Sequence, residues 1–526
     1  MHKNGISGHR IGYMNYLKNM RFLLQAITLL ISVTTIGQKQ RPNIIYMMSD
    51  DHGYQAISAY GYDLNKTPHI DKLAEEGVLF HRAFVTNSIC GPSRAVMLTG
   101  KHSHINGFKD NHSTFDGSQQ TVSKLFKNAG YQTAVVGKWH LVSEPQGFDY
   151  WNIVPGQGDY YNPDFIENGI RKRVPGYVTN LTTDFAINWL EKRDKSKPFF
   201  LIYQQKAPHR NWMPEPKYYH LFDSIQFPVP DNFFDDYKSR SSAATKQEME
   251  IATDMHYAYD LKLAFDISEE QRKGLAGSWH SIFNRMTSSE KQIYKEAYQP
   301  SIDVFSKANL SGEQLAIWKY QRYMREYLRC VQSVDDNVGR LMDYLKANDL
   351  DKNTIVIYTS DQGFYLGEHG WFDKRWMYEE SFRTPLIVKG PGIAKGKQTY
   401  SMVQNLDFAE TLLHLAGLPI PTDMQGKSFV PVLKGKKGGH DALYYHFYEN
   451  QEHRVAKHIG IRTARYKLIW FYELNEWELY DLETDKREMH NLYGKKEFAA
   501  IENMMKAQLS SLQQRYKDNT SPQLLR

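Results

Sequence analysis

Acidic, basic and histidine side chains gather just after several apolar runs of this sequence, where the strands of a sheet would end. They are Asp50 and Asp51, Lys138 and His140, Lys206 and His209, and Asp361 and Gln362. In wound α/β sheets the reactive groups collect at the carboxyl ends of strands, so we expect one shared active site. Three carboxylates are hard oxygen ligands suited to Ca²⁺, and without a cation they would repel one another. Solvated loop carboxylates are the alternative interpretation.

The stretch from Ser88 to Lys101 is the most informative part of the sequence. It contains Cys90-x-Pro92-x-Arg94 followed by Leu-Thr-Gly. A lone cysteine is more often a small buried apolar residue than a nucleophile, and with only one other cysteine the chain has neither a disulfide scaffold nor a CxxC metal pair. With these neighbours, however, the stretch resembles the signature of the type I sulfatases, in which the cysteine is oxidised to formylglycine.

The resemblance covers nearly the whole chain after the first forty residues, in the order that the family shows. Its other segments are Asn43–Asp51, Thr67–Asp71, Gly137–His140, Ala207–His209, Ser360–Gly363, Gly367–Gly370 and Lys374. It implies an α/β fold like that of alkaline phosphatase, with a large mixed sheet flanked by helices and a smaller C-terminal α+β domain. It also implies hydrolysis of sulfate esters.

The chemistry of a sulfate ester explains why these residue types occur together. The enzyme must neutralise the charge on the sulfate oxygens, supply a strong nucleophile and protonate the departing alkoxide. By the resemblance, one Ca²⁺ is bound by Asp50, Asp51, Asp361 and residue 90, with Gln362 as an auxiliary amide ligand. A formylglycine-generating maturation enzyme is then an implied partner.

The resemblance also implies roles for the remaining site residues. Cys90 becomes an aldehyde whose hydrate attacks sulfur, and Arg94 and Lys138 hold that hydrate. On the side of the leaving oxygen, His209 is the general acid and Lys374 lies beside it. His140 takes a proton from the second hydroxyl, which expels sulfate.

Aromatic and bidentate polar side chains are typical of glycan sites. Candidates for substrate binding are Trp371, Arg375, Trp376, His446, His453, Arg454 and Trp477. Tyr365–Glu380 and Ile461–Leu468 resemble segments of bacterial polysaccharide sulfatases similar to the N-acetylglucosamine-6-sulfatases and to those acting on algal polysaccharides. We therefore expect a sulfated glycan as substrate, such as a glycosaminoglycan, a mucin glycan or ulvan.

Two other functions compete with this interpretation. A phosphoester or phosphonate hydrolase of the same superfamily could use the same metal and nucleophile. A carbohydrate-binding relative that has lost turnover is the second alternative. The presence of Cys90 together with both lysines, both histidines and Arg94 argues against the second.

Composition sets broad limits on the function. The chain has 526 residues, of which 41% are hydrophobic and 24% charged, which excludes wholesale disorder. The net charge of +6 comes without any long basic run, so nucleic acid binding is not indicated.

The first forty residues predict export. Phe22–Gly37 is uncharged and apolar, follows Met20-Arg21, and is shorter than the roughly 20 residues of a membrane span. Residues 1–37 are therefore expected to be leader and signal peptide, cut before Gln38. The mature protein would be periplasmic or secreted and not membrane-bound. A buried core strand is the alternative.

Short apolar runs alternate with helical patterns and predict the sheet that positions the site. The runs are Asn43–Met48, Gln132–Val136, Pro198–Tyr203, Thr354–Tyr358 and Pro385–Val388. We expect a catalytic domain over 38–420 that carries a helical insertion at 226–328. An α+β subdomain over 421–526, with four short strands and a last helix at Glu497–Tyr516, would follow.

Overall fold

A computed structural model describes residues 41–265 and 267–524. The predicted signal peptide and leader, residues 1–37, lie outside the described residues, so export stays a prediction. No helix among the described residues is long and apolar enough to cross a bilayer.

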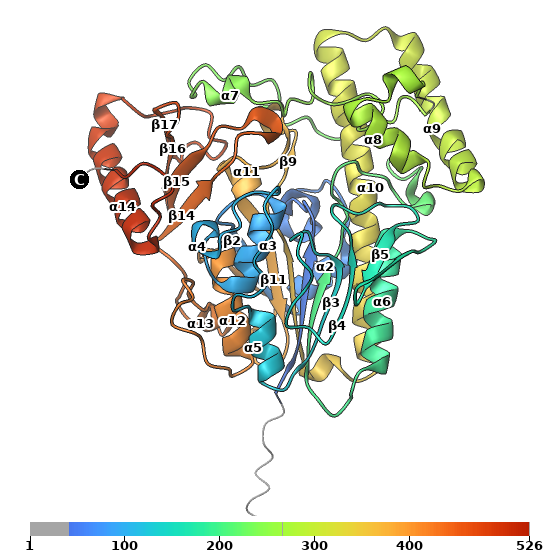
Figure 1. Cartoon of the computed structure of the whole chain (residues 1–526). Coiled ribbons are helices and arrows are strands. Elements are labelled where there is room, and N and C mark those ends of the chain that lie inside the picture. The colour runs from blue at the N-terminus through green and yellow to red at the C-terminus, as the bar shows by residue number, and fades with distance from the viewer. Residues whose placement is uncertain (1–40, 266, 525–526) are drawn as a thin grey trace, which may run out of the picture. The chain divides into compact units, whose positions relative to one another are not determined.

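Eleven strands of the described chain form one large mixed sheet (Figure 1). β1 is parallel to β7 and β8, whereas β11 is antiparallel to β8 and β2. In sheet order the strands are β12 (Lys397–Thr399), β2 (Gly77–Phe84), β11 (Arg383–Lys389), β8 (Thr354–Ser360), β1 (Asn43–Ser49), β7 (Phe199–Gln204), β3 (Gln132–Lys138), β4 (Tyr150–Val154), β5 (Asp164–Glu167) and β6 (Ile170–Arg173), with β13 (Val403–Gln404) paired to β2. All five predicted apolar runs are strands of this sheet, and the mixed sheet is confirmed.

Helices cover both faces of the sheet. Every residue of β1 is therefore buried, and its side chains alternate between two cores. Ile45 and Met47 pack with one set of helices. Ile44 and Tyr46 pack with the other. The first set is α2 (Pro68–Glu75), α6 (Val178–Lys192) and α10 (Gly312–Ala347), and the second is α3 (Cys90–Thr99), α5 (Val122–Asn128) and α12 (Phe408–Leu415).

The segment expected as a helical insertion contains α7 (Ala243–Lys246), α8 (Gly274–Phe283) and α9 (Ser288–Ala308). α9 begins at a capping box, in which the Thr287 hydroxyl accepts from the Glu290 N–H and the Glu290 carboxylate accepts from the Thr287 N–H. α10 runs without a break across residue 328, so one helix joins the insertion to the sheet.

The last part of the chain forms a second, antiparallel sheet. Its strands are β14 (Ala442–Phe447), β15 (His458–Thr463), β16 (Tyr466–Phe471) and β17 (Glu476–Asp481), and α14 (Ala499–Tyr516) packs on it. The smaller α+β unit is confirmed, although its boundary at 421 stays a prediction. Further short elements are α4 (Ser103–Asn106), β9 (Tyr365–Leu366), β10 (Phe372–Asp373), α11 (Glu379–Phe382) and α13 (Val430–Leu433).

Candidate active site

The carboxyl ends of four adjacent parallel strands bring most of the predicted site residues to one edge of the large sheet. β8, β1, β7 and β3 lie side by side in the same direction. Asp50 and Asp51 follow β1, Asp361 follows β8, and Lys138 is the last residue of β3. These four residues are fully buried, so their charges interact without screening by bulk water.

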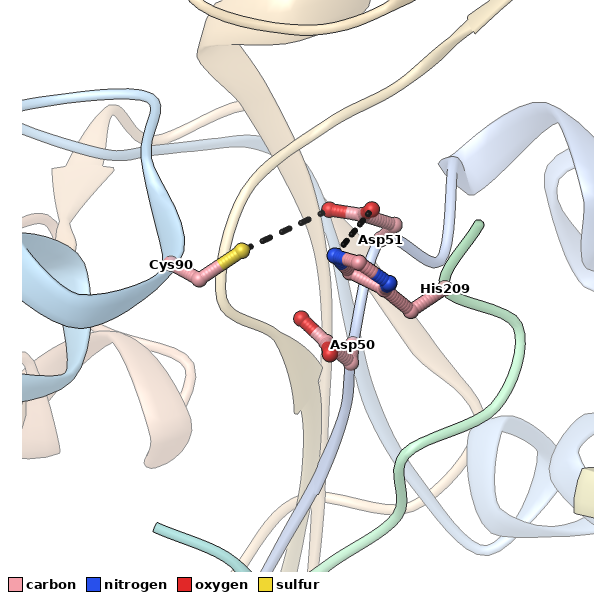
Figure 2. A group of neighbouring side chains, drawn as sticks. All are labelled: Asp50, Asp51, Cys90 and His209. Atoms are coloured by element: carbon pink, nitrogen blue, oxygen red, sulfur yellow. Dashed lines mark hydrogen bonds and ion pairs between the residues drawn. The ribbon is translucent and has the colours of Figure 1, made fainter. Parts of the chain in front are cut away.

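Cys90 reaches the same place from the first residue of α3. Ile89 before it is extended, and Pro92 in the first helical turn removes no helical hydrogen bond. The Cys90 Sγ lies 3.9 Å from Asp51 Oδ1 (Figure 2). It also lies 3.8 Å from Gln362 Nε2. Burial raises the pKa of the Cys90 thiol well above its usual value. An unmodified thiol here is therefore protonated and a poor nucleophile.

Arg94 lies one helical turn after Cys90 and joins the strand ends electrostatically. Its Nε and Nη2 donate to Asp361 Oδ2 at 3.1 and 2.8 Å, and its Nη1 donates to the Lys138 carbonyl at 2.7 Å. Its Nη2 is also 3.5 Å from Asp50 Oδ1. A buried guanidinium in this position neutralises two carboxylates and fixes their orientation.

Two lysines each pair with one of the adjacent aspartates. The Lys138 Nζ donates to Asp50 Oδ2 and, at 2.6 Å, to Gln157 Oε1. The Lys374 Nζ donates to both carboxylate oxygens of Asp51, at 2.8 and 2.7 Å. Burial raises the pKa of Asp50, but the attraction of neighbouring cations, first of all Lys138, outweighs it and holds that pKa well below the usual range.

Burial raises the pKa of the other two carboxyl groups, those of Asp51 and Asp361. Burial raises the pKa of Asp51 to about 6, because the attraction of Lys374 only partly offsets it. Burial, followed by repulsion from Asp50, raises the pKa of Asp361 to about 7. Additional positive charge at this point would favour the ionised form of both groups.

The oxygen donors at this place suit a hard divalent cation. Donor atoms of Asp50, Asp51, Cys90 and His209 all lie within 4.8 Å of one another. Among the described residues, Asp50 Oδ1 and Gln362 Oε1 are buried oxygens without a hydrogen-bond partner. Oxygens of this kind are the atoms that a Ca²⁺ ion binds.

Asp361 and Gln362 differ in how directly they face this group of donors. Asp361 Oδ1 accepts from the Asp51 N–H at 3.1 Å and its Oδ2 accepts from Arg94, so both oxygens already have donors. The Gln362 Nε2 donates to Asp51 Oδ1. A half-turn of the terminal amide would present Oε1 to the same place.

The two candidate histidines have different surroundings. The His209 Nε2 lies 3.7 Å from Asp51 Oδ2, and its Nδ1 lies 2.5 Å from the Arg210 carbonyl, which can only accept (Figure 2). The proton of neutral His209 is therefore on Nδ1. His140 has a positive φ of 56°, and its buried Nδ1 has no hydrogen-bond partner among the described residues. Burial, and then Lys138, hold the pKa of both imidazoles well below the usual value.

Several of the predicted substrate residues do not face the strand ends. Trp371 is fully buried and stacks on Tyr378 with ring centroids 5.8 Å apart. His446 is fully buried with its Nδ1 2.6 Å from Asp518 Oδ2. Trp376 is also buried in the core. Burial makes these three side chains part of the packing, so they are not available to a substrate in this structure.

Two other substrate candidates, Arg375 and His453, contact Asp373. This residue directly precedes Lys374 in the chain, so both candidates lie beside the site. The His453 Nε2 is 3.3 Å from Asp373 Oδ2, and Arg375 pairs with the same carboxylate. Arg454 points outward, with 71% of its side chain exposed, and pairs with Glu248 at 2.9 Å. Trp477 stacks on Trp470 in the C-terminal sheet.

Sequence reasoning missed three charged residues next to the site. Asp373 contacts Arg375 and His453 as described above. Arg210 donates to both carboxylate oxygens of Asp260 at 2.7 and 2.6 Å, and its Nη1 lies 3.5 Å from the His453 Nε2. The position of Arg210 next to His209 was an available signal. Asp260 belongs to the insertion and offered none.

The chain matches two family models. The first, described as sulfatase, covers residues 42–418. The second, N-sulphoglucosamine sulphohydrolase, C-terminal, covers residues 367–515. The two ranges together span the large sheet and all four strands of the smaller antiparallel one.

Individual relatives agree with the family models. An N-acetylglucosamine-6-O-sulfatase of Bacteroides thetaiotaomicron is 51% identical over 493 residues, which are 92% of this chain and 88% of the relative. An N-acetylglucosamine-6-sulfatase of Capra hircus is 27% identical over 75% of this chain and 64% of its own length.

Solved structures give the same result. One protein, in complex with its substrate D-glucosamine-2-N,6-O-disulfate, has a TM-score of 0.88 and 50% identity, covering 91% of this chain and 99% of its own. A phosphonate monoester hydrolase of Agrobacterium radiobacter, at 20% identity and a TM-score of 0.64 over 90% of this chain and 96% of its own, shares the fold alone. The chain belongs to the sulfatase family and is an enzyme that hydrolyses sulfuric esters.

Proposed function

We propose that this sulfatase removes the 6-O-sulfate from glucosamine or N-acetylglucosamine residues of sulfated glycosaminoglycans. One observation carries the proposal: the chain is 51% identical, over 92% of its length, to an enzyme named for that reaction. The 50% identical structure whose substrate carries a 6-O-sulfate supports the same assignment. Mucin glycans and ulvan are the alternative substrates.

The proposed cofactors are one Ca²⁺ ion and formylglycine made from Cys90 by a maturation enzyme. Asp50, Asp51, Asp361 and residue 90 would hold the ion, with Gln362 as an auxiliary ligand. When present, the cation neutralises sulfate oxygens and the hydrated aldehyde supplies the attacking oxygen. The unpartnered oxygens of Asp50 and Gln362, and the protonated state of the Cys90 thiol, support this proposal.

The cationic side chains keep the carboxylates in place and attract the substrate. Arg94 fixes Asp361, and Lys138 fixes Asp50. Lys374 is bound to Asp51 through two of its three N–H bonds, so its third N–H can bind an oxygen of the ester. This arrangement is organised before the substrate arrives, and such preorganised charge stabilises a transition state without reorganisation.

His209 is the proposed proton donor to the departing alkoxide. Its neutral ring has a lone pair on Nε2, the atom that faces Asp51. A bound sulfate ester brings negative charge next to this ring and favours its protonated form. Nε2 then carries the proton that the alkoxide takes. His140 is proposed to accept a proton from residue 90 when sulfate is released.

Arg375 and His453 are proposed to bind hydroxyl groups of the sugar, because both meet the Asp373 carboxylate next to Lys374. Arg454, the exposed residue after His453, is proposed as a further contact to the sugar. Contacts of this kind to the sugar contribute to transition-state binding, so small aryl sulfates should be poor substrates.

Sulfate release from a defined panel tests the proposal. N-acetylglucosamine-6-sulfate and D-glucosamine-2-N,6-O-disulfate should be hydrolysed, with NMR showing loss of the O6 group and retention of the N-sulfate. Ulvan fragments, 4-nitrophenyl sulfate and 4-nitrophenyl phosphate serve as comparisons. Faster release from the phosphate ester would overturn the sulfatase chemistry, and a preference for ulvan would overturn only the sugar assignment. Export to the periplasm or medium is a separate proposal, tested by cell fractionation and N-terminal sequencing.

A further inference from the structure

A groove lies on the surface beside β2. It consists of two adjoining hollows, with volumes of about 720 and 600 Å³. The hollows share Arg82, Tyr400 and Ala464, so they lie next to each other. Tyr62 lines the larger hollow, and Met504 on α14 lines the smaller one. We call this feature the Tyr400 groove.

The Tyr400 groove is separate from the active site. None of the candidate catalytic or metal-binding residues lines it. The segment from Gly363 to Gly370 lies between the two places. Its Phe364 ring lies 5.9 Å from the Lys374 Nζ, whereas its Glu368 lines the groove. Gln55 links both sides, since its Nε2 donates to the Phe364 carbonyl at 3.2 Å and to Glu368 Oε1 at 3.1 Å.

Exposed aromatic rings line the groove. Tyr400 is 63% exposed, and its ring stacks on His81 with centroids 4.6 Å apart and 13° between the planes. The other side of this stack is fixed by Tyr60, whose ring meets His81 edge-on at 5.8 Å. Tyr62, at 45% exposure, lies edge-on to Tyr54. Rigid exposed aromatic faces of this kind bind the apolar faces of sugar rings at low entropic cost.

Two arginines in the groove have no carboxylate within 4.0 Å among the described residues. Arg82 lies 5.8 Å from the Tyr400 ring centroid, and Arg383 lies 3.8 Å from the Tyr54 ring centroid. The Arg383 Nε has no hydrogen-bond partner in the described chain. By contrast, Glu379 in the same wall is held by Arg462 at 3.2 Å. Acidic residues also line the larger hollow, among them Asp231, Glu368 and Glu483. The guanidinium groups of Arg82 and Arg383 are therefore two local sites for an anionic group within a lining of mixed charge.

A buried carboxyl group also lines the groove. Glu380 is 7% exposed, and its Oε2 has no hydrogen-bond partner among the described residues. Burial, and then repulsion from Glu368, raises the pKa of Glu380 well above its usual value. A neutral carboxyl can both donate and accept, as sugar hydroxyl groups do. An unpartnered polar group at this depth is costly unless a ligand satisfies it.

We propose that the Tyr400 groove is a second, non-catalytic site that binds a stretch of a sulfated glycan chain. The sugar rings stack on Tyr400 and Tyr62, the sulfate groups meet Arg82 and Arg383, and a hydroxyl meets Glu380. The choice of a sulfated glycan as ligand rests on the proposed function, whereas the groove itself does not. Such a site raises the local concentration of chain ends at the active site by holding the polymer on the enzyme.

Binding of heparan sulfate to the full mature chain tests this proposal. The enzyme carries Cys90→Ala to prevent turnover, and excess D-glucosamine-2-N,6-O-disulfate saturates the active site. Tyr400→Ala and Arg82→Ala should each weaken the remaining heparan sulfate affinity by about five- to tenfold, the loss expected for one stacking or charge contact. The matched controls are Tyr257→Ala, a 45% exposed tyrosine outside the groove, and Lys436→Ala, an exposed lysine outside it. The controls should bind like the parent.

The same substitutions in the active enzyme separate the two proposals. Tyr400→Ala should leave turnover of N-acetylglucosamine-6-sulfate unchanged and slow desulfation of dilute heparan sulfate. Heparan sulfate binding that excess D-glucosamine-2-N,6-O-disulfate displaces completely, or that survives both groove substitutions, overturns the groove proposal and leaves the function standing. If the unsubstituted enzyme does not hydrolyse N-acetylglucosamine-6-sulfate but still binds heparan sulfate in the groove, only the proposed function is overturned. Absence of any heparan sulfate binding once the active site is saturated also overturns the groove proposal.

Discussion

The Lys374 ammonium group lies 2.8 and 2.7 Å from the two oxygens of Asp51, so one buried cation spans one buried carboxylate. Asp51 in turn faces Cys90 Sγ at 3.9 Å. Asp51 raises the pKa of Lys374 well above its usual value despite the opposing effect of burial. Lys374 therefore stays charged at any pH at which the enzyme could work, and Asp51 lies between it and residue 90.

Replacing Lys374 by Met should lower kcat for a sulfate ester by about 10²- to 10³-fold, the usual loss when one preorganised charge contact to a transition state is removed. Lys374→Arg keeps the charge and should recover part of this loss. Initial rates with N-acetylglucosamine-6-sulfate provide the measurement, with thermal unfolding as the check on folding. A Lys374→Met enzyme within about threefold of the parent would remove this residue from the mechanism.

Residue 90 should be formylglycine in the active enzyme. Burial keeps the Cys90 thiol protonated, so an unmodified cysteine supplies no strong nucleophile. Mass spectrometry of the tryptic peptide from a fully active preparation measures the modification directly. Cys90→Ala should abolish turnover and leave the melting temperature nearly unchanged, because the Sγ makes only contacts of 3.8 and 3.9 Å to its polar neighbours. An unmodified Cys90 peptide in active protein contradicts the prediction.

Chelation should lower activity and the melting temperature together. A cation bound only by the native state stabilises it by mass action, and here it would also relieve the repulsion between Asp361 and Asp50. Asp361→Ala should be more harmful than Gln362→Ala, because Asp361 also accepts two hydrogen bonds from Arg94. Metal analysis of both variants, with the parent as reference, checks the ligand roles. Full activity of a metal-free sample argues against the site.

The carboxylates of the site could be predicted because strand direction determines where they lie. Asp50, Asp51 and Asp361 each follow an apolar run, and parallel strands place such residues at one edge. The sequence pattern did not predict the direction of each strand. The run Pro385–Val388 is equally apolar in either direction, and β11 proves to be antiparallel to β8.

Side-chain exposure was the main failure of the prediction. Trp371 and His446 have residue types that suit a glycan site, but each is fully buried by a partner distant in sequence. His446 is covered by Asp518 and Trp371 by Tyr237. Burial depends on tertiary contacts that a local sequence pattern does not contain. For the same reason the sequence did not identify Asp260 as a residue next to the site.

Each member of the buried Arg210–Asp260 pair should depend on the other for its contribution to stability. Removing the charge of Asp260 alone leaves a buried guanidinium without its partner, which costs roughly 3–5 kcal/mol. We expect Asp260→Ala to lower the melting temperature more than the double variant Arg210→Met, Asp260→Leu, which leaves no buried charge. Because the His209 Nδ1 is bonded to the Arg210 carbonyl, kcat should fall in the single variant as well. Equal melting temperatures for single and double variants would show that the charge pairing is unimportant.

Glu410 should make the enzyme less stable as the pH rises. Its side chain is 1% exposed, its Oε1 accepts from the Gly426 N–H at 2.6 Å, and its Oε2 has no hydrogen-bond partner among the described residues. Burial raises the pKa of this carboxyl from 4.5 to about 8. Between these two pKa values the folded chain binds a proton that the unfolded chain has lost. The stabilisation is therefore complete below about pH 4.5 and is lost as the pH rises to about 8.

Glu410→Gln removes this dependence, because the amide keeps the acceptor for Gly426 and cannot ionise. The melting temperature of the parent should fall between pH 6 and pH 9 by more than that of the variant, on the order of a few kcal/mol in the free energy of unfolding. Above about pH 8 the variant should be the more stable protein. Glu144→Gln, at an exposed position, is the matched control and should follow the parent. Parallel curves for the parent and Glu410→Gln would mean that this carboxyl is already ionised in the folded enzyme at pH 6.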